Sequence, residues 1–179
     1  TIVVGAGWDN YNNVGDSGSC AVYVKPSGGW ATTSTATRVL YASDGAASDR
    51  LGWMTRISGD GNTIVASAEY VDVGGTADQG AAYVWVKGSA WSSATQTEAA
   101  KLTHSPGVAN DRLSYLGLDI SDDGDTIVAR VASNGLAVYV FVKAGGGWSN
   151  MTQSCKITNS DVSSNDYSTG VCISGDASK

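Results

Sequence analysis

The chain has 179 residues, of which 42% are hydrophobic, with 23 glycines, 2 prolines and a formal net charge of −6. This length is sufficient for one domain with a sizeable buried core. The 11 Lys and Arg residues form no basic cluster, which argues against nucleic acid as a partner because phosphate neutralisation requires clustered cations. No apolar run approaches the roughly 18 residues of a membrane span, so we expect no membrane insertion. The absence of an initiator Met and of a signal peptide predicts a processed form or a piece of a longer protein.

The most informative feature is a segment that recurs along the chain. Residues 57–65 read ISGDGNTIV and residues 120–128 read ISDDGDTIV. An Asp-Gly pair between two apolar runs predicts a β-hairpin, because Gly tolerates the positive φ of a tight turn. The first half of this segment returns at residues 173–179, and the second half opens the chain at residues 1–6. We therefore predict a repeat protein whose ends fall in the middle of a repeat unit.

Each repeat unit contains four segments that we expect to be strands, called B, C, D and A in chain order. Short strand-like runs, many glycines and the lack of a long amphipathic helix pattern predict an all-β fold. Four short strands per unit fit a propeller blade. We expect a single repeat domain of three four-stranded antiparallel β-propeller-type blades in B-C-D-A order, open or completed by neighbouring chains, with blades 1–62, 63–125 and 126–179.

The expected strands follow the repeat from unit to unit. B strands are expected at 1–6, 63–68 and 126–131, C strands at 19–25, 81–87 and 137–143, D strands at 37–41, 99–103 and 154–158, and A strands near 52–58, 115–121 and 168–174. The third unit is shorter because the B–C loop has lost about ten residues, which a surface loop tolerates.

The repeats resemble the FG-GAP family, and in particular its second subtype, which is common in bacterial and algal surface proteins. Leu51-Gly52 stands where the family has Phe-Gly, and Val4-Gly5-Ala6-Gly7 where it has Gly-Ala-Pro. The resemblance implies blades related to the seven-bladed propeller of integrin alpha subunits, and an extracellular or cell-surface location. It says little about function, because this fold hosts adhesion, ligand binding and enzymes alike. The chain departs from the family at 67–68, 130–131, 113–114 and 168–169, and the integrin calcium loop is absent at the hairpin.

The predicted strand order leaves one unpaired strand at each end. Such edges invite pairing with another chain, and propellers usually have four to eight blades. We expect an extracellular, non-enzymatic structural protein that assembles head-to-tail with itself, as a closed ring or a filament. The alternative is a fragment of a larger seven-bladed cell-surface propeller. The residues expected in the assembly strands are Thr1, Ile2, Val3 and Val4 of one copy and Val171, Cys172 and Ile173 of the next.

Catalysis is not expected from this sequence. His104 is the single histidine, stands in a turn beside no nucleophile motif, and is predicted to be a surface loop residue. No Ser/His/Asp set and no phosphate-binding Gly loop is recognisable.

Calcium is the one cofactor that the sequence suggests. Asp and Asn oxygens are ligands that Ca²⁺ takes. The same residues are ordinary turn formers, which is the reading that we favour. The candidate ligands are Asp9, Asn10, Asn12 and Asp16 in the first unit and Asp72 and Asp78 in the second.

A tryptophan follows every predicted C strand, at Trp30, Trp91 and Trp148. A Trp at one position of each repeat favours packing between blades. The alternative is a set of carbohydrate-stacking platforms, which would make the chain an adhesion or lectin-like module, calcium-assisted in one version, with glycans or extracellular proteins as partners.

Several single residues carry further predictions. Cys155 and Cys172 share a repeat and would form a disulfide if their strands adjoin; the alternative is small buried thiols. Asn150 opens an Asn-Met-Thr sequon and is a glycosylation candidate in a eukaryotic source. Arg56 and Asp119 occupy the same position of successive A strands and could pair across a blade interface. The repeated Asp49, Asp111 and Asp166 are expected to cap the turn that enters strand A.

Overall fold

The computed structural model describes residues 1–132, 137–158 and 170–177, and this part of the chain consists of β-strands with two single turns of 3-10 helix. No helix among these residues has the length and apolar character needed to cross a membrane. The strands are β1 (Ile2–Ala6), β2 (Ser19–Tyr23), β3 (Arg38–Leu40), β4 (Thr55–Ile57), β5 (Thr63–Ala68), β6 (Ala81–Val86), β7 (Ala100–Thr103), β8 (Leu118–Ile120), β9 (Thr126–Arg130), β10 (Val138–Val142), β11 (Met151–Thr152) and β12 (Cys155–Ile157), and the helical turns are η1 (Tyr11–Asn13) and η2 (Trp91–Ser93).

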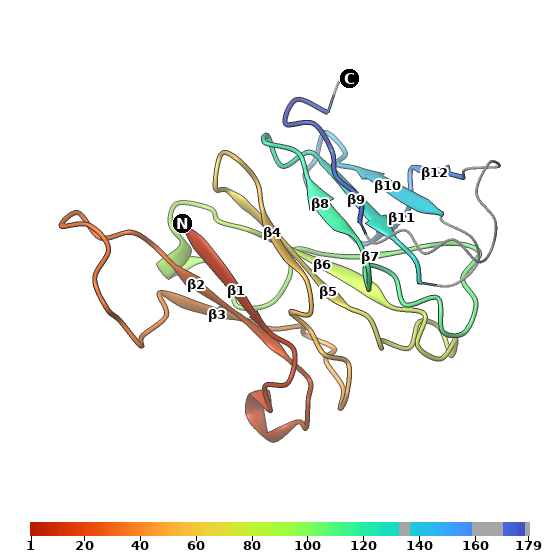
Figure 1. Ribbon diagram of the computed structural model, residues 1–179, viewed down its shortest axis with the longest axis horizontal. Coiled ribbons are helices and arrows are strands. Elements are labelled where there is room, and N and C mark those ends of the chain that lie inside the picture. The colour runs from red at the N-terminus through yellow and green to blue at the C-terminus, as the bar shows by residue number, and fades with distance from the viewer. Residues whose placement is uncertain (133–136, 159–169, 178–179) are drawn as a thin grey trace.

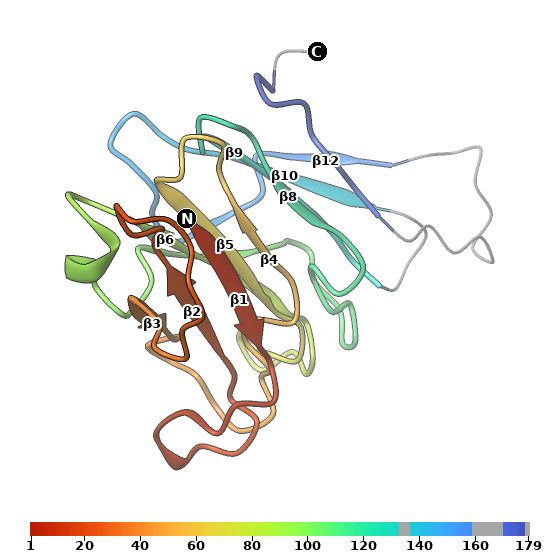
Figure 2. The same ribbon diagram turned by 60° about the vertical axis from the view of Figure 1, so that its left-hand side comes forward.

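The strands form three sheets that follow one another along the chain (Figure 1). The first sheet has the order β1-β2-β3, the second β11-β7-β6-β5-β4, and the third β12-β10-β9-β8. All pairings are antiparallel except that of β11 with β7, which is parallel. The strands that open the sheets, β1, β4 and β8, lie next to one another (Figure 2).

The all-β, antiparallel fold is confirmed, whereas three four-stranded sheets in B-C-D-A order are not. Each A strand pairs with the B strand that follows it through the Asp-Gly hairpin, so β4 joins β5 and β8 joins β9. The sheets therefore read A-B-C-D and are offset by one strand from units counted from residue 1. In the described residues the first sheet has no A strand, and the second gains β11 as a fifth strand.

Each of the two hairpins is stabilised by a serine at the same position of its repeat. In the first, the Ser58 hydroxyl donates to Asp60 Oδ1 (2.5 Å) and accepts the Thr63 N–H (3.0 Å). In the second, Ser121 makes the equivalent bonds, of 2.6 and 3.0 Å. The glycine of each turn has positive φ, 71° and 73°, which explains why Gly stands there.

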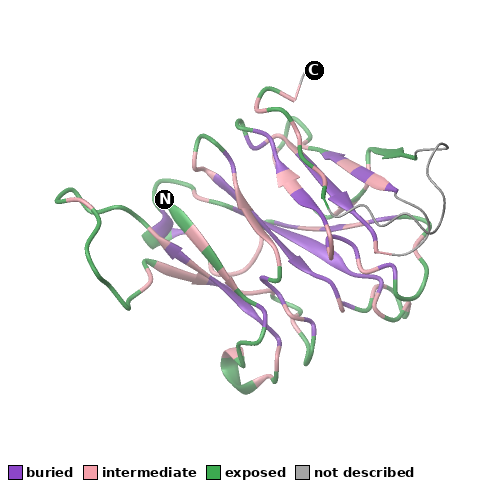
Figure 3. Cartoon of the chain, in the orientation of Figure 1, coloured by how far each residue is buried: buried purple, intermediate pink, exposed green. Residues whose placement is uncertain are grey.

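The second sheet lies between the other two, and its central strands β5 and β6 are buried on both faces. Side chains alternate along a strand, so Ile64 of β5 packs toward the first sheet and its neighbour Val65 toward the third. In β6, Tyr83 and Trp85 face the first sheet, while Val84 faces the third. Figure 3 shows β5 and β6 almost entirely buried, in contrast to β1.

The loops that lead from one sheet to the next dock on the loops between B and C strands. Leu51 N–H donates to Ser17 O, and Leu113 N–H donates to Gln79 O, both at 2.9 Å. Both leucines are buried, which accounts for the apolar residue at the family's Phe position. The predicted turn-capping role of Asp49 is confirmed, because its Oδ2 accepts the Ala46 N–H at 2.7 Å.

Candidate functional site

The first candidate feature is β1, a strand at the edge of the first sheet. Among the described residues it pairs with β2 alone, and its Ile2 and Val4 side chains are 46% and 48% exposed. In the internal sheets the equivalent strand is covered by an A strand. Since backbone bonding directions alternate in an antiparallel pair, Val3, like its counterpart Val65, directs its N–H and C=O to the uncovered side.

The second feature is the C-terminal segment 170–177, which lies beside β8 (Figure 1). Ile173 N–H donates to Asp119 Oδ2 at 3.0 Å, and Asp122 N–H donates to Gly175 O at 2.7 Å. The segment thus packs beside β8 in the same way as β8 packs beside β4. The Arg56–Asp119 pair predicted from the sequence is present between those two strands, with Nε 3.5 Å from Oδ1.

The turn of the hairpin is already formed in this segment. The Ser174 hydroxyl donates to Asp176 Oδ1 at 3.1 Å, as Ser58 and Ser121 do in the internal hairpins. Ala177 N–H donates to Ser174 O at 3.0 Å, and Ala177 has the positive φ (51°) of the two hairpin glycines. Residues 170–177 form no strand of their own, although an A strand was expected near 168–174, but they hold the hairpin turn in its preformed shape.

The three repeat tryptophans differ sharply in exposure. Trp91 and Trp148 are 1% and 8% exposed and belong to the two hydrophobic cores, so their ring faces are not available to a sugar. Trp30 is 48% exposed. The packing role is thereby supported for two of the three residues.

The candidate calcium ligands act as turn formers. Asn10 Oδ1 accepts the Asp16 N–H at 2.8 Å, and one repeat later Asp72 Oδ1 accepts the Asp78 N–H at 2.9 Å. This repetition was visible in the sequence as two polar residues six positions apart in each loop.

The remaining two candidates have similar structural roles. Asp9 Oδ2 accepts the Ser19 hydroxyl at 2.6 Å, and Asn12 lies in η1 with a φ of 53°. Within the described ranges, no group of three or more His, Cys, Asp or Glu side chains is arranged to hold a metal ion. The Ca²⁺ site stays a prediction without structural support.

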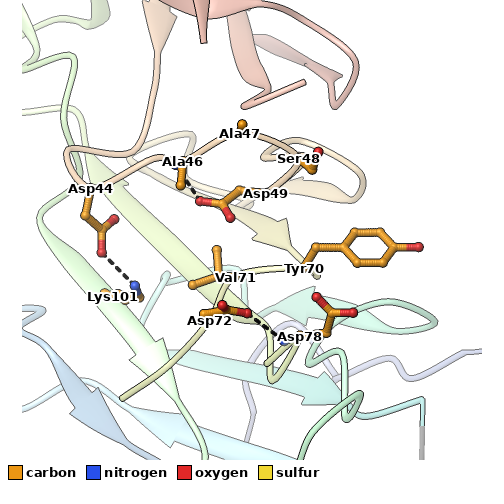
Figure 4. Close-up of a pocket in the computed structure, with 10 residues that line it drawn as sticks. All are labelled: Asp44, Ala46, Ala47, Ser48, Asp49, Tyr70, Val71, Asp72, Asp78 and Lys101. Atoms are coloured by element: carbon orange, nitrogen blue, oxygen red, sulfur yellow. Dashed lines mark hydrogen bonds and ion pairs between the residues drawn. The ribbon is translucent and has the colours of Figure 1, made fainter. Parts of the chain in front are cut away.

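A cavity of about 300 Å³, with several charged side chains in its lining, opens between loop 44–49 and loop 70–78 (Figure 4). Asp44 Oδ1 accepts the Tyr83 hydroxyl at 2.8 Å, and Lys101 Nζ lies 2.6 Å from Asp44 Oδ2. Burial raises the pKa of Asp44, but hydrogen bonds from Lys101 and Tyr83 outweigh burial and leave that pKa below its ordinary value. The aspartates that line this cavity therefore have structural roles, in hydrogen bonds and in an ion pair of the surrounding loops and strands. It is lined by Asp44, Ala46, Ala47, Ser48, Asp49, Tyr70, Val71, Asp72, Asp78 and Lys101.

The prediction of His104 as a surface residue is wrong. Its side chain is buried, with the ring centroid 4.7 Å from that of Tyr139 and Nε2 2.7 Å from Asp111 Oδ2. Asp111 also accepts the Val108 N–H at 2.8 Å, which confirms its predicted turn-capping role. The third residue of that series, Asp166, lies outside the described residues.

The predicted Cys155–Cys172 disulfide is not formed, and both thiols are free and exposed, while Cys20 is free and buried. Cys155 is in β12, whereas Cys172 lies beside β8, the opposite edge strand of the third sheet, and β10 and β9 lie between those two edge strands. The sequon residue Asn150 is exposed and accepts the Lys101 N–H at 2.7 Å. Its glycosylation stays a prediction.

Sequence reasoning missed a buried carboxyl group next to a stack of arginines and aromatic rings. Burial raises the pKa of Glu69 to about 7, although a hydrogen bond from its own backbone and the charges of Arg50 and Arg112 lower it. Arg50 lies over Trp8 (4.0 Å) and Tyr70 (4.5 Å), and Arg112 over Tyr70 (4.7 Å). The sequence signal that could have indicated this cluster is the arginine that occupies the same position of two repeat units, Arg50 and Arg112.

The geometry defines an all-β protein of repeated antiparallel sheets packed face to face. The family model described as FG-GAP repeat matches residues 35–85, from just before β3 almost to the end of β6. This stretch is therefore an FG-GAP repeat, as the resemblance implied, and the repeat suggests a propeller-type surface or adhesion-like module. Comparison with curated proteins finds no significant match.

Proposed function

We propose that the chain is a non-enzymatic structural module of the cell surface or extracellular space, and that copies associate head-to-tail by completing each other's hairpins. The observation that carries this proposal is the preformed A-type turn at 170–177 together with a B-type strand, β1, whose outer edge is paired with no A strand among the described residues. Backbone bonds of strand addition supply affinity, and the shared repeat supplies the register. The proposed location outside the cell is supported by the FG-GAP repeat, because such repeats are typically extracellular.

The internal hairpins give the register of the proposed pair. Arg56 is opposite Val65 and Asp119 is opposite Val128. The equivalent residues at the two ends are Cys172 and Val3. The proposed contact therefore places Cys172 of one copy opposite Val3 of the next, with Ile173 opposite Ile2 and Val171 opposite Val4.

Sheet packing supports the same arrangement. Ile2 and Val4 occupy the positions that Ile64 and Ala66 use to pack on the preceding sheet. At the other end, Val138 and Val140 of β10 are only partly buried, whereas their counterparts Ala82 and Val84 in β6 are fully buried against the third sheet. Stacking the third sheet of one copy on the first sheet of the next would cover both apolar faces, as happens between neighbouring sheets inside one copy.

Val3→Pro tests the proposal, because proline removes the outward N–H of β1 while the bonds of Ile2 and Val4 to β2 remain. We expect light scattering to show dimers or larger assemblies for the unmodified chain and monomers for Val3→Pro. Val3→Ala, which keeps the N–H and removes a similar part of the side chain, is expected to associate. An unmodified chain that stays monomeric, or a folded Val3→Pro chain that associates equally well, would contradict the proposal.

A further inference from the structure

The exposure of Trp30 follows a rule that the other two repeat tryptophans establish. Trp91 Nε1 donates to Gly61 O at 3.1 Å, and Trp148 Nε1 donates to Gly124 O at 3.0 Å. Each acceptor is the third residue after the hairpin serine of the same sheet. Each indole is also covered by the preceding sheet, the first sheet for Trp91 and the second for Trp148. A buried repeat tryptophan therefore needs both a hairpin turn and a preceding sheet.

Trp30 lacks both partners, although its loop has the right shape. The loop that leads to Trp30 has the same length as the loop that leads to Trp148, counted from Lys25 and Lys143. The backbone also agrees: Gly29 and Gly147 have φ of 96° and 104°, and each donates to the carbonyl three residues before it, at 3.0 and 2.9 Å. Trp30 is thus presented as Trp148 is, but among the described residues neither a hairpin turn of its own sheet nor a preceding sheet covers it.

We propose that Trp30 is the anchor of the interface between copies, with its indole N–H donating to the Ala177 carbonyl of the neighbouring chain. Ala177 is the third residue after Ser174, has the positive φ of Gly61 and Gly124, and ends the preformed turn. The third sheet of the same neighbour would supply the missing preceding sheet. This inference rests on the proposed head-to-tail association and names the side chain that makes it tight.

The turn has a second contact in this arrangement. Inside one copy, neighbouring hairpin turns are joined by backbone bonds, from Asp60 N–H to Asp122 O (2.9 Å) and from Asp122 N–H to Gly175 O (2.7 Å). In the proposed contact, the C-terminal turn of the neighbouring copy would lie under Trp30 and next to the hairpin turn of the second sheet. A backbone N–H of that turn would then donate to the carbonyl of Gly59, which is exposed. Trp30, the β1 edge and Gly59 then form one continuous receiving surface.

The dissociation constant of the Trp30→Ala variant tests the inference. Large aromatic residues buried at an interface cost 2 kcal/mol or more when truncated, so we expect association to weaken by about 30-fold or more in sedimentation analysis. Trp30→Phe keeps an apolar ring but loses the N–H donor, and we expect an intermediate weakening of up to about tenfold. Trp53→Ala is the matched control, because Trp53 is 42% exposed but its ring stacks on Tyr115 of the same copy, with centroids 5.9 Å apart, and it is expected to leave the dissociation constant unchanged.

A spectroscopic readout separates contact from an indirect effect. The indole N–H resonance that disappears in Trp30→Phe is expected to exchange more slowly with solvent when copies associate. If the chain associates and Val3→Pro blocks association, but Trp30→Ala retains the original dissociation constant, the anchor is overturned and the proposed function stands. If the unmodified chain is monomeric at every concentration, both are overturned.

Discussion

Replacing Asp111 by alanine is expected to destabilise the fold by about 2–4 kcal/mol, because two groups lose the acceptor that they share, at roughly 1–3 kcal/mol for each buried group left unpaired. One carboxylate oxygen of Asp111 serves two groups, the Val108 N–H and His104 Nε2. His104 is buried and has no other described hydrogen bond for its ring, since Nδ1 is unpaired. Urea denaturation followed by tryptophan fluorescence measures the change in the free energy of unfolding.

Asp49→Ala is the control that the repeat itself provides. Asp49 occupies the same turn one unit earlier and accepts the equivalent N–H, from Ala46, without a histidine beside it. We expect a loss of about 1 kcal/mol, typical of one hydrogen bond. Equal losses for the two variants would show that the His104 contact contributes nothing to stability.

Glu69→Gln is expected to remove a pH dependence of stability that the unmodified chain shows between about pH 4.5 and 7. The folded protein raises the pKa of Glu69 from 4.5 to about 7, so it binds the proton more tightly than the unfolded chain. The stability from this group is complete below pH 4.5 and is lost as pH rises through 7. The loss is on the order of 3 kcal/mol, because each pKa unit corresponds to about 1.4 kcal/mol.

The difference between two pH profiles isolates this contribution. Unfolding free energies of the unmodified chain and of Glu69→Gln, measured from pH 4 to 8, are expected to diverge in favour of the variant as pH rises. Glu98→Gln is the control, because the Glu98 carboxylate accepts hydrogen bonds from Ser43 and lies away from Glu69. Parallel profiles for Glu69→Gln and the unmodified chain would mean that the pKa of Glu69 is the same in the folded and the unfolded protein.

Much of the fold was predictable because it depends on local signals. The Asp-Gly turns, the alternation of apolar residues and the repeat placed β5, β6 and β9 close to their observed bounds. The Arg56–Asp119 pair was predictable for the same reason, since equivalent positions in neighbouring strands face each other. The offset of the sheets arose because units were counted from residue 1, although the hairpin already required each A strand to join the B strand after it.

The site was less predictable because its features depend on contacts between distant residues. His104 stands in a turn-like sequence, and only the packing of Tyr139 and Asp111 around it makes it a buried residue. The three repeat tryptophans look alike in sequence. The exposure of Trp30 follows from a neighbouring sheet and turn that its own sheet lacks, and no local pattern records this.

The most direct test of head-to-tail association is to mix two variants that are each blocked at one end. Val3→Pro blocks β1 and leaves segment 170–177 intact. Cys172→Pro blocks that segment, because Ile173 N–H points to Asp119 and the alternation directs the Cys172 N–H away from β8. We expect each variant alone to be a folded monomer, and an equimolar mixture to form a one-to-one dimer in light scattering. A mixture that stays monomeric, although the unmodified chain associates, would contradict the proposed contact between β1 and segment 170–177.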